Sequence, residues 1–143
     1  MTLQVHLSVS LGAAACSALL ALAAGHPLAA DALCQSLSAV VAHAPNGFAM
    51  LEGDLSHNSP DGNPTQRRAT VAMPGSIGCV INFGKQYYCD YPNGTDVDAL
   101  AAHVARCLKS AQRVDSQVFK TPNAAKVSVV DDDDEVALVI EMS

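Results

Sequence analysis

The residues of this sequence that could do chemistry are few and far apart. The segment Pro74–Gly78 reads P-G-S-I-G and approximates the G-x-S-x-G turn that presents a nucleophilic serine. Its first residue is proline, however, and a strand rather than a helix is expected to follow, so we interpret it as a glycine turn. His43, His57 and His103 fall on a helix end, a polar loop and an exposed helix face, with no i, i+4 pair that could bind a metal ion. We predict three surface histidines, no catalytic residue, no metal site and no cofactor.

The most unusual feature is the uninterrupted acidic run Asp131–Glu135. Adjacent carboxylates repel one another, and a hairpin tip would let them point into water, where they also prevent pairing between sheet edges. A calcium loop needs ligands at alternating positions and a glycine turn, which this run lacks. Besides a solubilising turn, the run therefore indicates an acidic patch for a basic protein partner. The candidate partner-binding residues are Asp131, Asp132, Asp133 and Asp134.

The cysteines indicate two disulfides. Cys16 lies in the leader described below, which leaves Cys34, Cys79, Cys89 and Cys107. Their spacing contains no C-x-x-C pair of the kind that binds zinc. Three pairings are possible. Because Cys34 and Cys107 both fall on apolar helix faces, we favour Cys34–Cys107 with Cys79–Cys89, each contributing about 2–4 kcal/mol by restricting the unfolded chain.

Residues 1–30 have the composition of a signal peptide. They contain no Asp, Glu, Lys or Arg, and an apolar run from Leu7 to Ala24 ends before small residues that suit cleavage after Ala30. The expected mature chain is the single compact domain 31–143, exported to the periplasm or outside the cell. The segment lacks the usual Lys or Arg, and its length could just span a bilayer, so a retained anchor is the alternative. Once the leader is cleaved, no stable membrane insertion is expected.

The first half of the mature chain predicts a helix and then mostly irregular structure. Asp31 is a plausible N-cap, and Pro45–Gly47 would end the helix. Phe48–Leu51 is a short strand candidate, Glu52–Gln66 is expected to be a long exposed loop, and Ala69–Met73 reads as another strand. The apolar face of the helix comprises Leu33, Cys34, Leu37, Val40, Val41 and Ala44.

A hairpin is expected between Cys79–Phe83 and Gln86–Cys89, turning at Gly84-Lys85. A three-residue loop would place Cys79 directly opposite Cys89. A two-residue loop would instead put the two cysteines on opposite faces, because a slip of one residue reverses the direction of every side chain. The disulfide between them therefore depends on the turn.

A second amphipathic helix and a second hairpin follow. Thr95 can cap the helix after the Asn93-Gly94 turn. In the hairpin, a four-residue loop at Asp131–Asp134 would pair Val129 with Val136 and give one wholly apolar face. The stripe of the helix comprises Val97, Leu100, Ala101, Val104, Cys107, Leu108 and Ala111. The expected fold class is α+β: a small antiparallel sheet packed by two amphipathic helices and braced by two disulfides.

The formal net charge of −6 argues against nucleic-acid binding, and Arg67-Arg68 is the only adjacent basic pair. Small disulfide-braced domains without clustered acid, base and nucleophile residues usually act by surface recognition. We therefore expect a secreted or periplasmic binding protein of the inhibitor or immunity type rather than an enzyme. Two alternatives stay open: a small hydrolase whose site assembles only in the fold, such as His57 with Asp54 or Asp61, and a structural envelope component.

Overall fold

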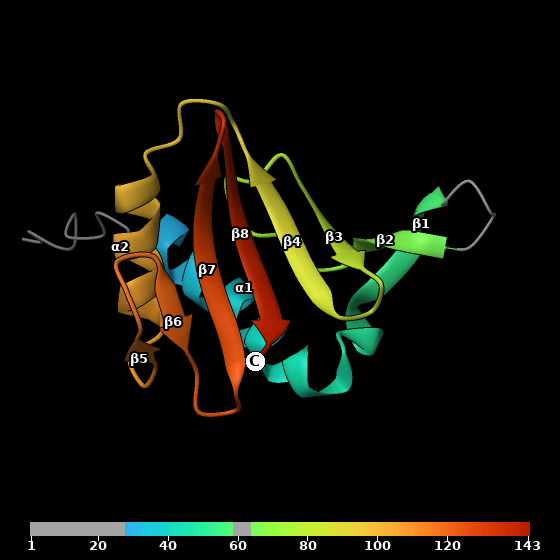
Figure 1. The fold of residues 1–143 in the computed structure, drawn as a ribbon, viewed down its shortest axis with the longest axis horizontal. Coiled ribbons are helices and arrows are strands. Elements are labelled where there is room, and N and C mark those ends of the chain that lie inside the picture. Colours follow the sequence, from blue (N-terminus) through green and yellow to red (C-terminus); the bar gives the residue numbers. More distant parts are fainter. Residues whose placement is uncertain (1–27, 59–63) are drawn as a thin grey trace, which may run out of the picture.

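The computed structural model describes residues 28–58 and 64–143, so most of the predicted leader, including Cys16, lies outside the described part. The described chain has an α+β fold (Figure 1). Eight strands form one antiparallel sheet in the order β1-β2-β3-β4-β8-β7-β6-β5, which is larger than the sheet expected from the sequence. The elements are α1 (Leu28–His43), η1 (Ala44–Asn46), η2 (Ala49–Leu51), β1 (Glu52–Asn58), β2 (Pro64–Ala69), β3 (Gly78–Asn82), β4 (Gln86–Tyr91), α2 (Val97–Cys107), β5 (Gln112–Arg113), β6 (Val118–Lys120), β7 (Ala125–Asp132) and β8 (Glu135–Met142), where η marks a 3-10 helix.

Helix α1 has the predicted apolar face. Leu33, Leu37 and Val40 are buried and recur at helical spacing. The helix begins at Leu28, so Asp31 lies inside it and the N-cap prediction for Asp31 is wrong. The predicted end is confirmed, because α1 stops at His43 and the following turn closes at Gly47, whose φ of 63° is a left-handed conformation suited to glycine.

The segment after α1 differs most from the prediction. Phe48–Leu51 is no strand: Phe48 has a φ of 61° and precedes the short helix η2. The ring of Phe48 packs against the ring of Tyr87, with 6.1 Å between their centroids. The expected loop Glu52–Gln66 instead contains β1 and the start of β2, whereas Ala69–Met73 contributes only Ala69 to a strand. Strand β1 lies at the edge of the sheet and has register irregularities, so it can be built from polar residues without an apolar alternation.

The β3–β4 hairpin resolves the alternative left open by the sequence. Asn82 pairs with Gln86, so the loop Phe83–Lys85 has three residues and Cys79 pairs directly with Cys89. The loop contains two left-handed residues in succession, Phe83 at φ 51° and Gly84 at φ 62°. The hairpin thus brings the two cysteines together on one face of the sheet.

Helix α2 is capped by Asp96 rather than by Thr95. The Asp96 carboxylate accepts a hydrogen bond of 3.0 Å from the Ala99 amide, whereas the Thr95 hydroxyl donates to the Pro92 carbonyl in the preceding turn. The helix ends at Cys107, before the predicted Ala111. Its buried residues belong to the predicted stripe and are Leu100, Ala101 and Val104.

The β7–β8 hairpin turns on two residues instead of four. Asp133 and Asp134 have φ values of 45° and 75°, the pair of left-handed conformations that a type I′ turn requires. Val129 therefore faces Leu138, not Val136. The shift is two residues along the strand, so every side chain keeps the face predicted for it.

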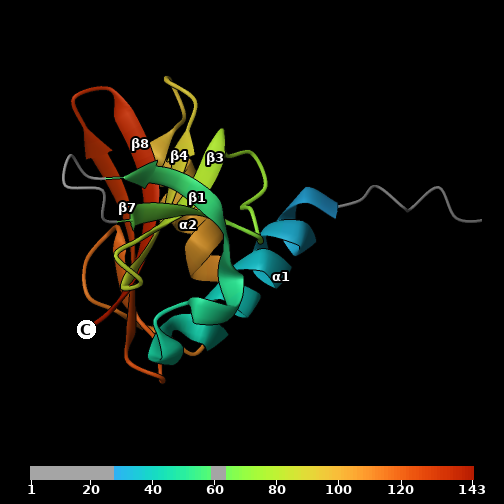
Figure 2. The ribbon, with the colours of Figure 1, turned by 90° about the vertical axis from the view of Figure 1, so that its right-hand side faces the viewer.

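The core lies on one side of the sheet, where Figure 1 shows α1 behind strands β7 and β8 and Figure 2 shows it to the right of them. Helix α1 packs against α2, and α2 packs against β7. We call this side of the sheet the inner face, and the opposite side the outer face. The largest fully buried inner-face side chains are Tyr87, Ile81, Leu138 and Ile140. Strand β8 lies between β4 and β7 and thereby connects the two halves of the sheet.

Candidate binding surface

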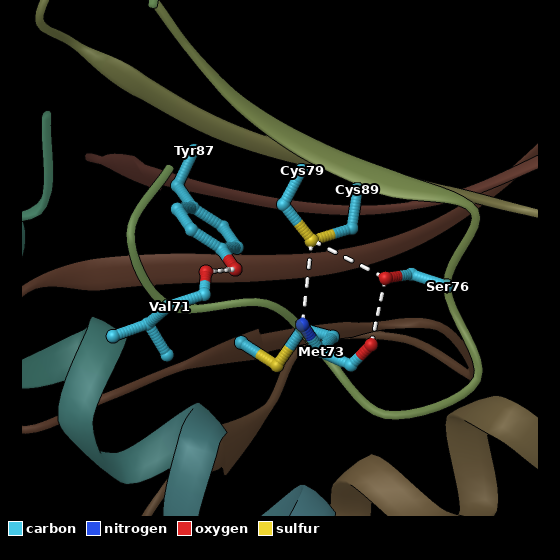
Figure 3. Close-up of a disulfide and its surroundings, with 6 residues drawn as sticks. All are labelled: Val71, Met73, Ser76, Cys79, Tyr87 and Cys89. Atoms are coloured by element: carbon cyan, nitrogen blue, oxygen red, sulfur yellow. Dashed lines mark hydrogen bonds between the residues drawn. A yellow bond between two sulfur atoms is a disulfide. The ribbon is translucent and has the colours of Figure 1, made fainter. Parts of the chain in front are cut away.

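Two disulfides cross-link the fold, one between the two helices and one between two strands. Their pairing is the one favoured from the sequence. Cys34 of α1 is bonded to Cys107, the last residue of α2. Cys79 and Cys89 join β3 to β4 (Figure 3). The Met73 amide donates a hydrogen bond of 3.3 Å to the sulfur of Cys79. The loop between β2 and β3 is thereby attached to the inner face.

Ser76 of the P-G-S-I-G segment lies beside the disulfide between the strands. Its hydroxyl donates a hydrogen bond of 2.6 Å to the Met73 carbonyl oxygen and lies 3.4 Å from the sulfur of Cys79 (Figure 3). Gly75 beside it has a φ of 82°, as a glycine turn requires. These contacts give Ser76 a structural role at the disulfide.

The histidines whose side chains the structure describes, His43 and His103, lie on different helices, α1 and α2. His43 is half-buried at the end of α1, and the side chain of His57 lies outside the described residues, as does Asp61. His103 departs from the prediction of a solvated histidine, because its Nε2 atom is buried and has no hydrogen-bond partner among the described residues. The proposed pairing of His57 with Asp54 or Asp61 therefore lies outside what the structure describes.

Two inner-face tyrosines support the core rather than a reactive site. The Tyr87 hydroxyl donates a hydrogen bond of 2.6 Å to the Val71 carbonyl oxygen (Figure 3). Burial raises the pKa of Tyr87 far above its ordinary value, and the proximity of Tyr91 raises it further. Burial also raises the pKa of Tyr91 to about 12. Both phenols are neutral at physiological pH and serve as apolar packing with a polar end.

The acidic run lies at the tip of the β7–β8 hairpin, and the structure divides it between two faces. Asp132 pairs with Glu135, and their side chains belong to the outer face. Asp131 pairs with Val136 and belongs to the inner side, while Asp133 and Asp134 form the turn. All of these carboxylates are exposed. The four candidate residues Asp131–Asp134 are therefore distributed over the inner side, the outer face and the turn.

Tyr88 of β4 lies on the same outer face as three carboxylates. Burial raises the pKa of Tyr88, and the negative charges of Asp90, Glu135 and Asp132 raise it further. These groups come from β4, β8 and β7. We call them the acidic patch, which comprises Tyr88, Asp90, Asp132 and Glu135 on the outer face. The ion pairs among the described residues, Glu52–Arg67 and Lys126–Glu141, involve none of these carboxylates. The patch thus presents three carboxylates outside those ion pairs on the face that also carries Tyr88.

Sequence reasoning missed Tyr88 and Asp90 as site residues. Residues two apart in a strand share a face, so Tyr88 and Asp90 could have been grouped from the alternation in β4 alone. Their proximity to the acidic run depends on the pairing of β4 with β8, which joins segments about fifty residues apart in the chain. No local sequence pattern predicts which strand pairs with β4.

Within residues 28–58 and 64–143 there is no group of three or more His, Cys, Asp or Glu side chains placed to hold a metal ion. Over the same residues, no helix combines the length and apolar character needed to cross a membrane. A comparison of the chain with family models, curated proteins and solved structures finds no significant match.

Proposed function

We propose that this chain is an exported binding protein whose acidic patch recognises a basic surface on a protein partner. The observation that carries the proposal is that Asp90, Asp132 and Glu135, from three neighbouring strands, lie on the same outer face as Tyr88. Like charges held together by a rigid sheet repel one another, and an arriving Lys or Arg side chain would relieve that repulsion. The phenol ring offers the kind of rigid, amphipathic contact that is enriched at the centres of interfaces.

The location of the patch supports this role. We also infer that α1 and α2 together cover the inner face, which leaves the outer face of the central strands for contact. Tyr88 and Asp90 then belong to the outer face of β4, a strand that is paired on both sides, with β3 and with β8. A contact site on such a scaffold loses little conformational entropy on binding.

Export is supported by the disulfides and the predicted leader. Disulfides are typical of proteins in oxidising compartments, and both bonds are formed in this chain. The composition of residues 1–30 is that of a signal peptide. We therefore place the protein in the periplasm or outside the cell.

The test compares two variants of equal charge change. Asp132→Asn with Glu135→Gln removes two charges from the patch, and Asp54→Asn with Asp98→Asn removes two exposed charges elsewhere. The oxidised wild-type protein and both variants are immobilised and exposed to exported proteins at low and at moderate salt. Bound proteins are then quantified by mass spectrometry.

A specific partner should bind the wild type and the Asp54/Asp98 control equally, and the patch variant at least about tenfold more weakly, the equivalent of about 1.4 kcal/mol. Its retention should fall with added salt, because exposed charges are screened within about 10 Å at 0.1 M ionic strength. Equal retention by all three proteins would refute the acidic patch as the interface. Capture that is indifferent to salt would also contradict the electrostatic reasoning.

A further inference from the structure

Phe83 is held out into solvent at the β3–β4 turn, at the end of the sheet opposite the β7–β8 turn (Figure 1). It is 71% exposed, and its φ of 51° is a left-handed conformation that glycine adopts more readily. The backbone is fixed by a hydrogen bond of 3.0 Å from the Phe83 amide to the Thr65 carbonyl oxygen. Neither turn chemistry nor core packing favours a large apolar residue at this position.

Phe83 lies between two hollows that share it and Gly84 as walls. Cavity volumes of about 710 Å³ and about 320 Å³ lie on its two sides. Both fall in the range of about 300–1,000 Å³ that is usual for small-molecule sites. The larger hollow is also lined by Pro45, Asn82, Lys85, Gln86, Glu141 and Met142. The smaller one is also lined by Glu52, Thr65, Gln66, Arg67 and Ile81.

A continuous row of polar side chains crosses the outer face, and its central members contribute to the hollows: Asn82, Gln86 and Glu141 line the larger one and Gln66 lines the smaller one. We call this row the polar ladder, and its members, one on each of six strands from β1 to β7, are Ser56, Gln66, Asn82, Gln86, Glu141 and Lys126. The first three steps are hydrogen bonds of 3.1 Å, each donated toward Glu141. The Gln86 amide then donates to Glu141 at 3.4 Å, and Lys126 contacts the other carboxylate oxygen at 2.6 Å.

The hydrogen bonds of the ladder fix the orientation of its carboxamide groups but use only part of their donors and acceptors. A primary carboxamide has two N–H donors and an oxygen with two lone pairs, and the ladder uses one N–H each of Gln66, Asn82 and Gln86. The remaining donors and acceptors stand in a fixed row beside Phe83. A ligand that used them would not have to order these side chains, which lowers the entropic cost of binding.

We propose that the hollows around Phe83 bind a neutral saccharide. A sugar ring has an apolar C–H face that can lie on the exposed phenyl ring, and hydroxyl groups that both donate and accept. The carboxamides of the polar ladder supply the matching donors and acceptors, and Glu141 supplies a carboxylate acceptor.

The carboxylates around the site are already paired and do not call for a cationic ligand. Glu52 lies 3.5 Å from Arg67, and Lys126 lies 2.6 Å from Glu141, so each carboxylate lining the hollows is already paired with a cation. The paired carboxylates do not favour a cationic ligand, and the carboxamides between them suit hydroxyl groups, to which Lys85 at the larger hollow adds a further donor. The site lies at the opposite end of the sheet from the acidic patch, so the two proposals can fail independently.

The test is titration of the oxidised, ¹⁵N-labelled protein with cellobiose, N,N′-diacetylchitobiose, maltose and mannobiose at millimolar concentration. The side-chain amide signals of Gln66, Asn82 and Gln86 report on the ladder directly. Phe83→Gly removes the ring and suits the left-handed turn, so its fold should be retained. Ile77→Ala is the matched control, because Ile77 is 70% exposed but lines neither hollow.

At least one disaccharide should shift the ladder amide signals in the wild type and in Ile77→Ala, and Phe83→Gly should bind it at least about tenfold more weakly. The absence of shifts with all four sugars would overturn the proposal. Equal binding by Phe83→Gly would also overturn it. Shifts produced only by a peptide of apolar sequence, added as a fifth probe, would assign the hollows to a protein partner instead.

Discussion

Removing the disulfide between the helices should cost more stability than removing the one within the sheet. The helix bond Cys34–Cys107 closes a sequence separation of 73 residues, whereas Cys79–Cys89 closes a separation of 10. A cross-link acts mainly by restricting the unfolded chain, and a longer loop loses more conformational entropy. The two bonds of this protein therefore offer an internal comparison.

The chain-entropy relation gives the magnitudes. For these two loops it predicts a loss of about 4.4 kcal/mol without the helix bond and about 2.7 kcal/mol without the strand bond at 25 °C. Domains of this size are usually stable by about 5–15 kcal/mol, so the larger loss is a substantial fraction of the total. The expected difference between the two variants is about 1.7 kcal/mol.

The assay is urea denaturation followed by circular dichroism. Cys34→Ala with Cys107→Ala suits helical positions, while Cys79→Val with Cys89→Val keeps volume at two buried strand positions. The free energies of unfolding of the two double variants are compared with that of the oxidised wild type. The reasoning is refuted when the strand variant loses as much stability as the helix variant. Reduced wild type should be the least stable sample, since it lacks both constraints.

Two further outcomes are expected. Gly47→Ala should destabilise the fold by about 2 kcal/mol or more in urea denaturation, because the new Cβ would lie 2.5 Å from the Gly84 carbonyl oxygen at a φ of 63°. Gly78→Ala, which meets no atom within 4 Å, should change stability little, and equal losses would contradict this. The hydrogen bond from Lys126 lowers the pKa of Glu141, so its stabilising effect should be present above the unfolded pKa, near 4.5, and be lost as the pH falls through the lower folded value. The stability difference between wild type and Glu141→Gln should therefore shrink toward acidic pH in denaturation curves, and a difference constant down to pH 3 would be inconsistent with it.

The features that the sequence predicted well are those carried by local periodicity. The apolar face of α1 and the stripe of α2 follow from spacings of three and four residues. Whether Cys79 lies opposite Cys89 depended on a single local unknown, the number of residues in the turn between their strands. In the β7–β8 hairpin the turn length was wrong, yet the face of each side chain was right because the error was an even number of residues.

The features that were missed depend on non-local pairing or on unusual backbone conformations. Strand β1 is polar and irregular, so its sequence is indistinguishable from that of a loop. Phe83 reads as the last apolar residue of a strand, whereas its left-handed φ turns it out of the sheet. The acidic patch and the polar ladder each collect residues from separate strands, and their assembly requires the strand order.

The place of β8 has a consequence for the order of folding events. It follows all seven other strands in the chain, yet it pairs with β4 on one side and β7 on the other. A chain that has not yet extended through β8 can form the hairpin β3–β4 and the pair β6–β7, but it has no strand to join them. During synthesis the sheet therefore remains two separate fragments, and one late step, the arrival of β8, both completes the polar ladder through Glu141 and assembles the acidic patch.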